Sequence, residues 1–152
     1  MQELSREYGA SFLYETNVGA GLPIIDTLKN LIASGDRIHK IQAVLSGSLN
    51  FVFNTYDGTA PFYKTVEQAM EEGYTEPDPK IDLSGVDVAR KILILARESG
   101  LKMELSDIEN ESFLSEESLN TENNEDFFSL LQEDESNKFK AIYEDAAKDG
   151  AQ

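Results

Sequence analysis

Two prolines separated by one residue, Pro77 and Pro79, constrain this chain more than any other feature of its sequence. Each proline ring fixes its own φ and disfavours the α region for the residue before it. Glu76 and Asp78 are therefore expected on extended, stiff backbone rather than inside a helix. Because such backbone aims their carboxylates before any ligand arrives, we interpret this stretch as a functional site.

A helix is expected directly after Gly85, because apolar residues recur there at helical spacing around most of the circumference. Asp87 and Lys91 lie four residues apart in it, so their side chains leave the same helix face. We expect them to converge with the acidic groups of the preceding proline-rich stretch. The alternative is a solvated surface pair that adds about 0.3–0.5 kcal/mol to helix stability. A calcium loop does not fit, because Leu83 and Ala89 stand where an EF-hand needs Gly and Glu.

The composition excludes several classes of function. A chain of 152 residues with 40% hydrophobic residues can bury a core as one domain. It has no apolar run of membrane-spanning length and no apolar signal core, so we expect a cytoplasmic protein. The absence of cysteine excludes disulfides and thiolate zinc sites, and His39, the only histidine, is interpreted as an ordinary strand residue. The net charge of −16 argues against nucleic acid as a partner.

The pattern along the chain predicts an α/β (α+β) fold, in which helices pack on one face of a small, incomplete sheet. Strands are expected at residues 10–15 and 38–45. The expected helices are residues 3–8, 24–32, 49–56, 66–72, 86–98, 126–132 and 137–148, with a polar linker over 115–125. Two strands under several helices make a poor independent unit, so residues 1–152 are expected to form one incomplete domain.

Two glycine-containing turns follow the expected strands. Gly19 and Gly21 suggest a dinucleotide fingerprint, but Ile24 stands where its third glycine belongs, so we interpret them as a tight turn with inward-facing carbonyls. Gly47 and Ser48 precede a helix whose first N–H groups suit a substrate carboxylate. A plain helix cap by Ser48 is the alternative.

Three segments, residues 14–23, 45–49 and 73–91, closely resemble homoserine dehydrogenase, above all the dehydrogenase half of the bifunctional aspartokinase/homoserine dehydrogenases. The resemblance implies the NAD(P)H-dependent interconversion of L-aspartate 4-semialdehyde and L-homoserine, in threonine, methionine and isoleucine biosynthesis. It also implies a Rossmann domain joined to a catalytic and dimerisation domain in a homodimer. This chain would represent part of the catalytic domain without the nucleotide-binding domain, so we expect it to be inactive alone.

The resemblance assigns roles residue by residue. Lys91 matches the acid/base lysine and Asp87 its partner carboxylate. The remaining matches are Glu76, Asp82, Gly47, Ser48 and Tyr74 for the substrate, Gly73 for the cofactor, and the carbonyls of Glu15, Val18, Ala20 and Leu22 for a monovalent cation, usually sodium. The chemistry is compatible, because hydride transfer to an aldehyde leaves an alkoxide that an ammonium can neutralise and protonate.

Two other functions compete with this interpretation. The chain would be an acidic interaction or scaffold domain without catalysis if Glu76, Asp87 and Lys91 diverged into water. It would be a cation-binding module if carboxylate side chains, rather than carbonyls, surrounded an ion. The preference between NAD and NADP is not set by these residues.

Overall fold

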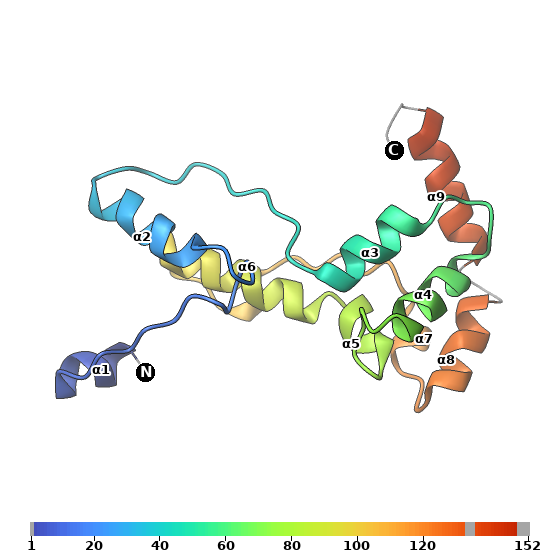
Figure 1. The fold of residues 1–152 in the computed structure, drawn as a ribbon, viewed down its shortest axis with the longest axis horizontal. Helices are drawn as coiled ribbons and strands as arrows, with labels where there is room; N and C mark the ends of the chain where they lie inside the picture. Colours follow the sequence, from blue (N-terminus) through green and yellow to red (C-terminus); the bar gives the residue numbers. More distant parts are fainter. Residues whose placement is uncertain (1, 133–135, 149–152) are drawn as a thin grey trace. The chain divides into compact units, whose positions relative to one another are not determined.

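The computed structural model describes residues 2–132 and 136–148, and the chain divides into two compact units. Unit 1 comprises Met1–Leu45 and Arg90–Ile108, and unit 2 comprises Ser46–Ala89 and Glu109–Gln152. Figure 1 labels the helices in chain order.

The helices of each unit are short to medium in length. Unit 1 contains α1 (Gln2–Tyr8), α2 (Ile24–Ala33) and the 3-10 turn η1 (Leu105–Asp107). Unit 2 contains α3 (Gly47–Thr55), α4 (Phe62–Glu71), α5 (Pro79–Leu83), α7 (Glu116–Leu119), α8 (Asn124–Leu130) and α9 (Ser136–Lys148). Helix α6 (Val86–Glu98) begins in the range of unit 2 and continues in unit 1.

The expected sheet was wrong, because residues 2–132 and 136–148 contain no β-strand (Figure 1). The segments 10–15 and 38–45 lie in irregular backbone, and Leu13 and Val44 are 90% and 75% exposed. A strand exists only where its N–H and C=O groups pair with a neighbour, and these segments have no such neighbour within the described ranges. His39 is exposed in this irregular backbone and not in a strand.

The predicted helices were confirmed, with shifts at their ends. Helix α4 begins four residues earlier than predicted, at Phe62. The expected linker over residues 115–125 contains α7, which Ser115 caps by accepting a hydrogen bond from the Ser118 N–H at 3.1 Å. The structure also adds α5, which the sequence did not predict.

The core of unit 2 is largely aromatic. The rings of Phe62 on α4 and Phe139 on α9 stack with centroids 3.7 Å apart and planes 15° apart. The other fully or nearly buried members of this cluster are Val52, Tyr56, Val66, Ala69, Leu83, Leu114, Phe127 and Leu131. Helices α3, α4, α5, α8 and α9 are thus fixed to one another by apolar burial.

The core of unit 1 is smaller. Val18, Leu28 and Leu95 are buried together, and Leu45 and Ile38 pack against them. Leu28 comes from α2 and Leu95 from α6, so these two helices hold the glycine turn that contains Val18. No helix among the described residues has the length and apolar character that a membrane span requires.

Candidate functional site

Asp82 links two of the predicted substrate-binding segments within unit 2. Its Oδ1 accepts a hydrogen bond from the Ser48 hydroxyl at 2.7 Å, and its Oδ2 accepts one from the Glu76 N–H at 2.8 Å. Ser48 is only 5% exposed. One carboxylate therefore fixes the first turn of α3 and the backbone of the proline-rich stretch at the same time.

The cap of α3 is Ser46 rather than Ser48, which corrects the alternative interpretation of that turn. The Ser46 hydroxyl accepts a hydrogen bond from the Leu49 N–H at 3.2 Å, and its oxygen lies 2.9 Å from the Ser48 hydroxyl oxygen. Ser48 is therefore free of the capping role and donates to Asp82. Gly47 lies in the first turn of the helix and is exposed.

The proline-rich stretch is extended at Asp78, as predicted, with φ −106° and ψ 102°. Asp78 caps α5 by accepting a hydrogen bond from the Lys80 N–H at 3.0 Å, and Pro79 occupies the first helical turn. The Lys80 ammonium lies 3.5 Å from the Asp78 carboxylate and is largely buried. The Glu76 side chain, by contrast, is exposed.

Gly73 and Tyr74 end α4. Gly73 has φ +78°, and the Tyr74 N–H donates to the Ala69 carbonyl at 2.8 Å, which is a Schellman closure. The Tyr74 ring stacks on Phe51 with centroids 4.1 Å apart. A Cβ at Gly73 would meet no atom within 4 Å, so the space beside this backbone is open.

Lys91 lies half-buried on α6. Its ammonium donates a hydrogen bond to the Leu45 carbonyl at 2.9 Å, and both residues belong to unit 1. Asp87 is exposed one helical turn earlier on α6, at the predicted spacing of four residues. The helix is as predicted, while the catalytic roles of both residues and their convergence with the acidic groups of the proline-rich stretch stay predictions.

The glycine turn of unit 1 is tight, as predicted. Gly19 has φ +83°, and a Cβ there would lie 2.5 Å from an Ile24 side-chain atom, so only glycine fits. Ala20 also has a positive φ, 52°. The Leu22 carbonyl accepts a hydrogen bond from the Ile24 N–H at 2.8 Å, and Val18 is buried.

Sequence reasoning missed the function of the Glu15 side chain. Its carboxylate accepts hydrogen bonds from the Ile25 and Asp26 N–H groups at 2.7 and 2.8 Å, so it caps α2 from ten residues away. Its backbone carbonyl is the group that the resemblance assigns to a cation. Within the described residues, no three His, Cys, Asp or Glu side chains are grouped to hold a metal ion.

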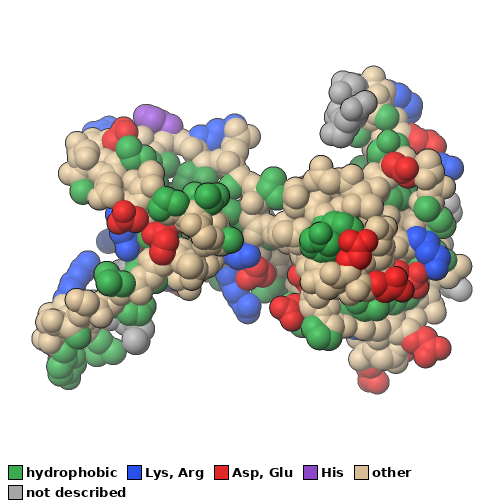
Figure 2. Space-filling model, in the orientation of Figure 1, with side chains coloured by type: hydrophobic (Ala, Val, Ile, Leu, Met, Phe, Trp, Pro, Cys, Tyr) green, Lys and Arg blue, Asp and Glu red, His purple; other side chains and the backbone are tan. Residues whose placement is uncertain are grey.

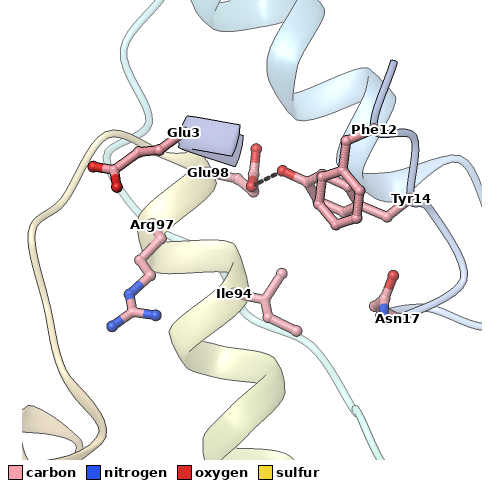
Figure 3. Close-up of a pocket in the computed structure, with 7 residues that line it drawn as sticks. All are labelled: Glu3, Phe12, Tyr14, Asn17, Ile94, Arg97 and Glu98. Carbon is pink, nitrogen blue, oxygen red and sulfur yellow. Dashed lines mark hydrogen bonds between the residues drawn. The ribbon is translucent and has the colours of Figure 1, made fainter. Parts of the chain in front are cut away.

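Unit 1 also has a hollow of about 510 Å³ that the sequence did not reveal (Figure 3). On its wall the Tyr14 hydroxyl is hydrogen bonded to the Glu98 carboxylate. The Lys29 ammonium lies 4.0 Å from the Tyr14 ring centroid and 3.7 Å from Glu98. Burial disfavours the charged form of Lys29, but Tyr14 and Glu98 outweigh it, so the pKa of Lys29 is raised.

The structure thus groups the predicted residues within each unit. In unit 2 it brings together Ser48, Asp82 and the Glu76 backbone. In unit 1 it connects Lys91 to Leu45. Acidic side chains are visible in several separate places on the face shown in Figure 2 and form no single patch there.

Comparison with known proteins gives a consistent result. A family model described as homoserine dehydrogenase matches residues 23–151. A homoserine dehydrogenase from Schizosaccharomyces pombe is 45% identical over 152 aligned residues, covering 96% of this chain and 40% of that protein. A chloroplastic bifunctional aspartokinase/homoserine dehydrogenase 2 from Zea mays is 51% identical over 116 residues, covering 76% of this chain and 13% of that protein.

A solved structure has a similar fold. The crystal structure of a protein of unknown function from Candida auris matches with a TM-score of 0.85 and 34% identity, over 97% of this chain and 44% of that one. The chain spans less than half the length of each of these proteins.

Proposed function

This chain belongs to the homoserine dehydrogenase family, and on that premise we propose that it forms the substrate-binding and proton-transfer part of a homoserine dehydrogenase. The complete enzyme would interconvert L-aspartate 4-semialdehyde and L-homoserine. The observation that carries the proposal is the pair of hydrogen bonds to Asp82, because they fix the Ser48 turn and the Glu76 backbone together. Such preorganisation is what a binding site for a small polar molecule requires.

The two ends of the amino-acid substrate would be recognised by groups of unit 2. The exposed Glu76 carboxylate would bind the substrate ammonium. The first N–H groups of α3, at Gly47 and Ser48, would bind its carboxylate. Because both oxygens of Asp82 accept hydrogen bonds from Ser48 and Glu76, we assign Asp82 the role of holding these two residues in place.

Lys91 would supply the proton. NAD(P)H, when bound, would supply the hydride for the aldehyde carbon, and Gly73, where an added Cβ would meet no atom within 4 Å, would contact the cofactor, as the family resemblance implies. The oxygen of the substrate then carries the developing negative charge, which the Lys91 ammonium would neutralise and protonate. The hydrogen bond to the Leu45 carbonyl fixes one of the three donors of this ammonium and so orients it.

Several finer expectations stay predictions. They are the sodium site at the carbonyls of Glu15, Val18, Ala20 and Leu22, the homodimer, the cytoplasmic location and the use of NADP. The tight turn at Gly19 and Ala20 is compatible with the sodium site, in which backbone carbonyl oxygens would be the ligands.

Binding of L-homoserine to the purified chain tests the proposal. We expect saturable, stereospecific shifts of the Ser48, Tyr74 and Glu76 amide resonances in NMR spectra, with D-homoserine as the control ligand. Glu76→Gln should weaken this binding. An interaction or scaffold domain without a substrate site would show no saturable shift with either enantiomer, and that result would overturn the proposal.

Turnover is a separate test. The chain alone should not oxidise L-homoserine with NADP, whereas the same chain joined to the flanking segments of a relative, including its nucleotide-binding domain, should do so. Lys91→Ala in the joined protein should abolish turnover while leaving homoserine binding measurable. Turnover that survives Lys91→Ala would remove Lys91 from the proposed role.

A further inference from the structure

Helix α8 contacts the proline-rich stretch at two points within unit 2. The Asn124 side-chain amide donates a hydrogen bond to the Pro77 carbonyl at 2.9 Å, across 47 residues of sequence. The Lys80 ammonium lies 5.6 Å from the centroid of the Phe127 ring, at cation–π distance. The segment that contains Glu76 is therefore held by a helix from the C-terminal part of the chain.

Helix α8 is itself held in place by core packing and by a cap at its N-terminus. Phe127 and Leu131 are fully buried in the core of unit 2. The Asn123 side chain caps the helix, because it accepts a hydrogen bond from the Asp126 N–H and donates one to the Asp126 carboxylate, both at 2.9 Å. Asn124, the first residue of the helix, thus reaches Pro77 from a position set by core packing and by a capping pair.

The backbone around Glu76 is held on both sides. Before its Cα, the Glu76 N–H donates to Asp82 at 2.8 Å. After it, the Thr75 hydroxyl donates to the Glu76 carbonyl at 2.9 Å, the Pro77 ring fixes φ, and Asn124 holds the Pro77 carbonyl. Without Asn124, the Pro77 carbonyl would lose this hydrogen bond, which restrains the ψ angle of Pro77.

Glu76 depends on this support because its side chain is exposed. An exposed carboxylate is not held by neighbouring side chains, so the region that it can reach is set by the position of its backbone. A shift of the Glu76–Pro77 segment would therefore move the carboxylate directly, with no core packing to restrain it.

We propose that Asn124 is a positioning residue that aims the Glu76 carboxylate at the ammonium group of an α-amino-acid substrate. This inference rests on the proposed function, in which Glu76 binds that ammonium. Asn124 itself does not touch the substrate. Its effect on binding passes entirely through the segment from Pro77 to Glu76.

The test is a double-mutant cycle on L-homoserine affinity, measured by NMR titration of the purified chain. Asn124→Ala should weaken binding about fivefold, the effect of losing one net hydrogen bond. Asn124→Asp, which keeps the shape but cannot donate to the carbonyl, should weaken it at least as much. Asn124→Gln, which keeps the amide donor, should remain within about twofold of the original affinity.

The combined variant with Glu76→Gln is the decisive measurement. If Asn124 acts through Glu76, adding Asn124→Ala to Glu76→Gln should produce no further loss, because the charge that Asn124 aims is already gone. Asn120→Ala is the matched control, since among the described residues the Asn120 side-chain amide donates a local hydrogen bond, to the Glu116 carbonyl at 2.7 Å. It should leave the affinity unchanged, and circular dichroism should show that every variant is folded.

Each of the other possible results contradicts either this inference or the proposed function. Normal affinity in Asn124→Ala with weakened affinity in Glu76→Gln overturns this inference and leaves the proposed function intact. Fully additive losses show that Asn124 does not act through Glu76 and also overturn the inference. Absence of homoserine binding by the unmodified chain overturns the proposed function, and the inference with it.

Discussion

Ser48 and Asp82 are 34 residues apart in the sequence, yet the Ser48 hydroxyl donates a hydrogen bond to the Asp82 carboxylate at 2.7 Å. Ser48 is buried at the start of α3, and Asp82 lies on α5. Since a buried hydroxyl that loses its acceptor pays the full cost of desolvation, this pair stabilises the packing of α3 on α5 as well as arranging the site.

Asp82→Ala should therefore lower the free energy of unfolding of unit 2 by about 1–3 kcal/mol, because it leaves the Ser48 hydroxyl and the Glu76 N–H without their acceptor. Urea denaturation followed by circular dichroism measures the change. Glu71→Ala, at an exposed acidic position on α4, is the control and should stay within about 0.5 kcal/mol. Equal values for the two variants would contradict a structural role for Asp82.

Phe139→Ala should destabilise unit 2 more strongly, by about 3–5 kcal/mol, since its ring is 4% exposed and stacks on Phe62 in the core. Ile142→Ala on the same helix is the control, because Ile142 is 52% exposed and should cost no more than about 0.5 kcal/mol. The measurement is the urea concentration at the midpoint of the loss of α9 helicity. Similar midpoints for the two variants would show that α9 is not anchored through Phe139.

The helices were predictable from the sequence because their determinants are local. Apolar residues recur at helical spacing within each helix, as do the buried Leu28 on α2 and Leu95 on α6, and this pattern needs no distant partner. The strands were not predictable in the same way. Ile41 and Val44 have the residue types of a strand, yet they are 43% and 75% exposed, because a strand needs a partner that local sequence does not specify.

Some features of the site were likewise predictable from local sequence, and others were not. Extended backbone at Asp78 follows from the proline that comes after it, and the shared helix face of Asp87 and Lys91 follows from their spacing within α6. The hydrogen bond from Asn124 to the Pro77 carbonyl and the caps made by the Glu15 carboxylate depend on the folded chain. No periodicity or motif marks them, so only the structure reveals them.

Asp57 should respond to a change at Thr59. The hydroxyl of Thr59 donates to the Asp57 carboxylate at 2.6 Å and its N–H at 2.9 Å, and these bonds lower the pKa of Asp57. Thr59→Val removes the hydroxyl, so the pKa of Asp57 should rise toward its ordinary value. NMR titration of the Asp57 carboxyl carbon measures it, with Thr27→Val in unit 1 as a control that should change nothing.

The sign of the pH dependence follows from that lowered pKa. The contribution of the Asp57 turn to stability is fully present above the pKa that Asp57 has in the unfolded chain. It is lost as the pH falls through the lower pKa of the folded state. In Thr59→Val this contribution should be smaller, and its loss should be complete at higher pH, because the pKa of the folded state lies closer to that of the unfolded chain. An unchanged acid limb of the stability profile would contradict the role of the hydroxyl.

Glu15→Ala tests the capping role of the Glu15 carboxylate separately from the proposed binding of sodium by its backbone carbonyl. Loss of the carboxylate leaves the Ile25 and Asp26 N–H groups without their cap, so thermal unfolding should show unit 1 destabilised by about 1–2 kcal/mol. Glu7→Ala on α1, an exposed position, is the control. If the Glu15 carbonyl is a sodium ligand, as the family resemblance implies, any stabilisation by sodium chloride over choline chloride should survive in Glu15→Ala, because that substitution keeps the carbonyl. A sodium effect that disappears with the side chain would instead make the carboxylate the ligand, and the cap and the cation would then compete for the same oxygens.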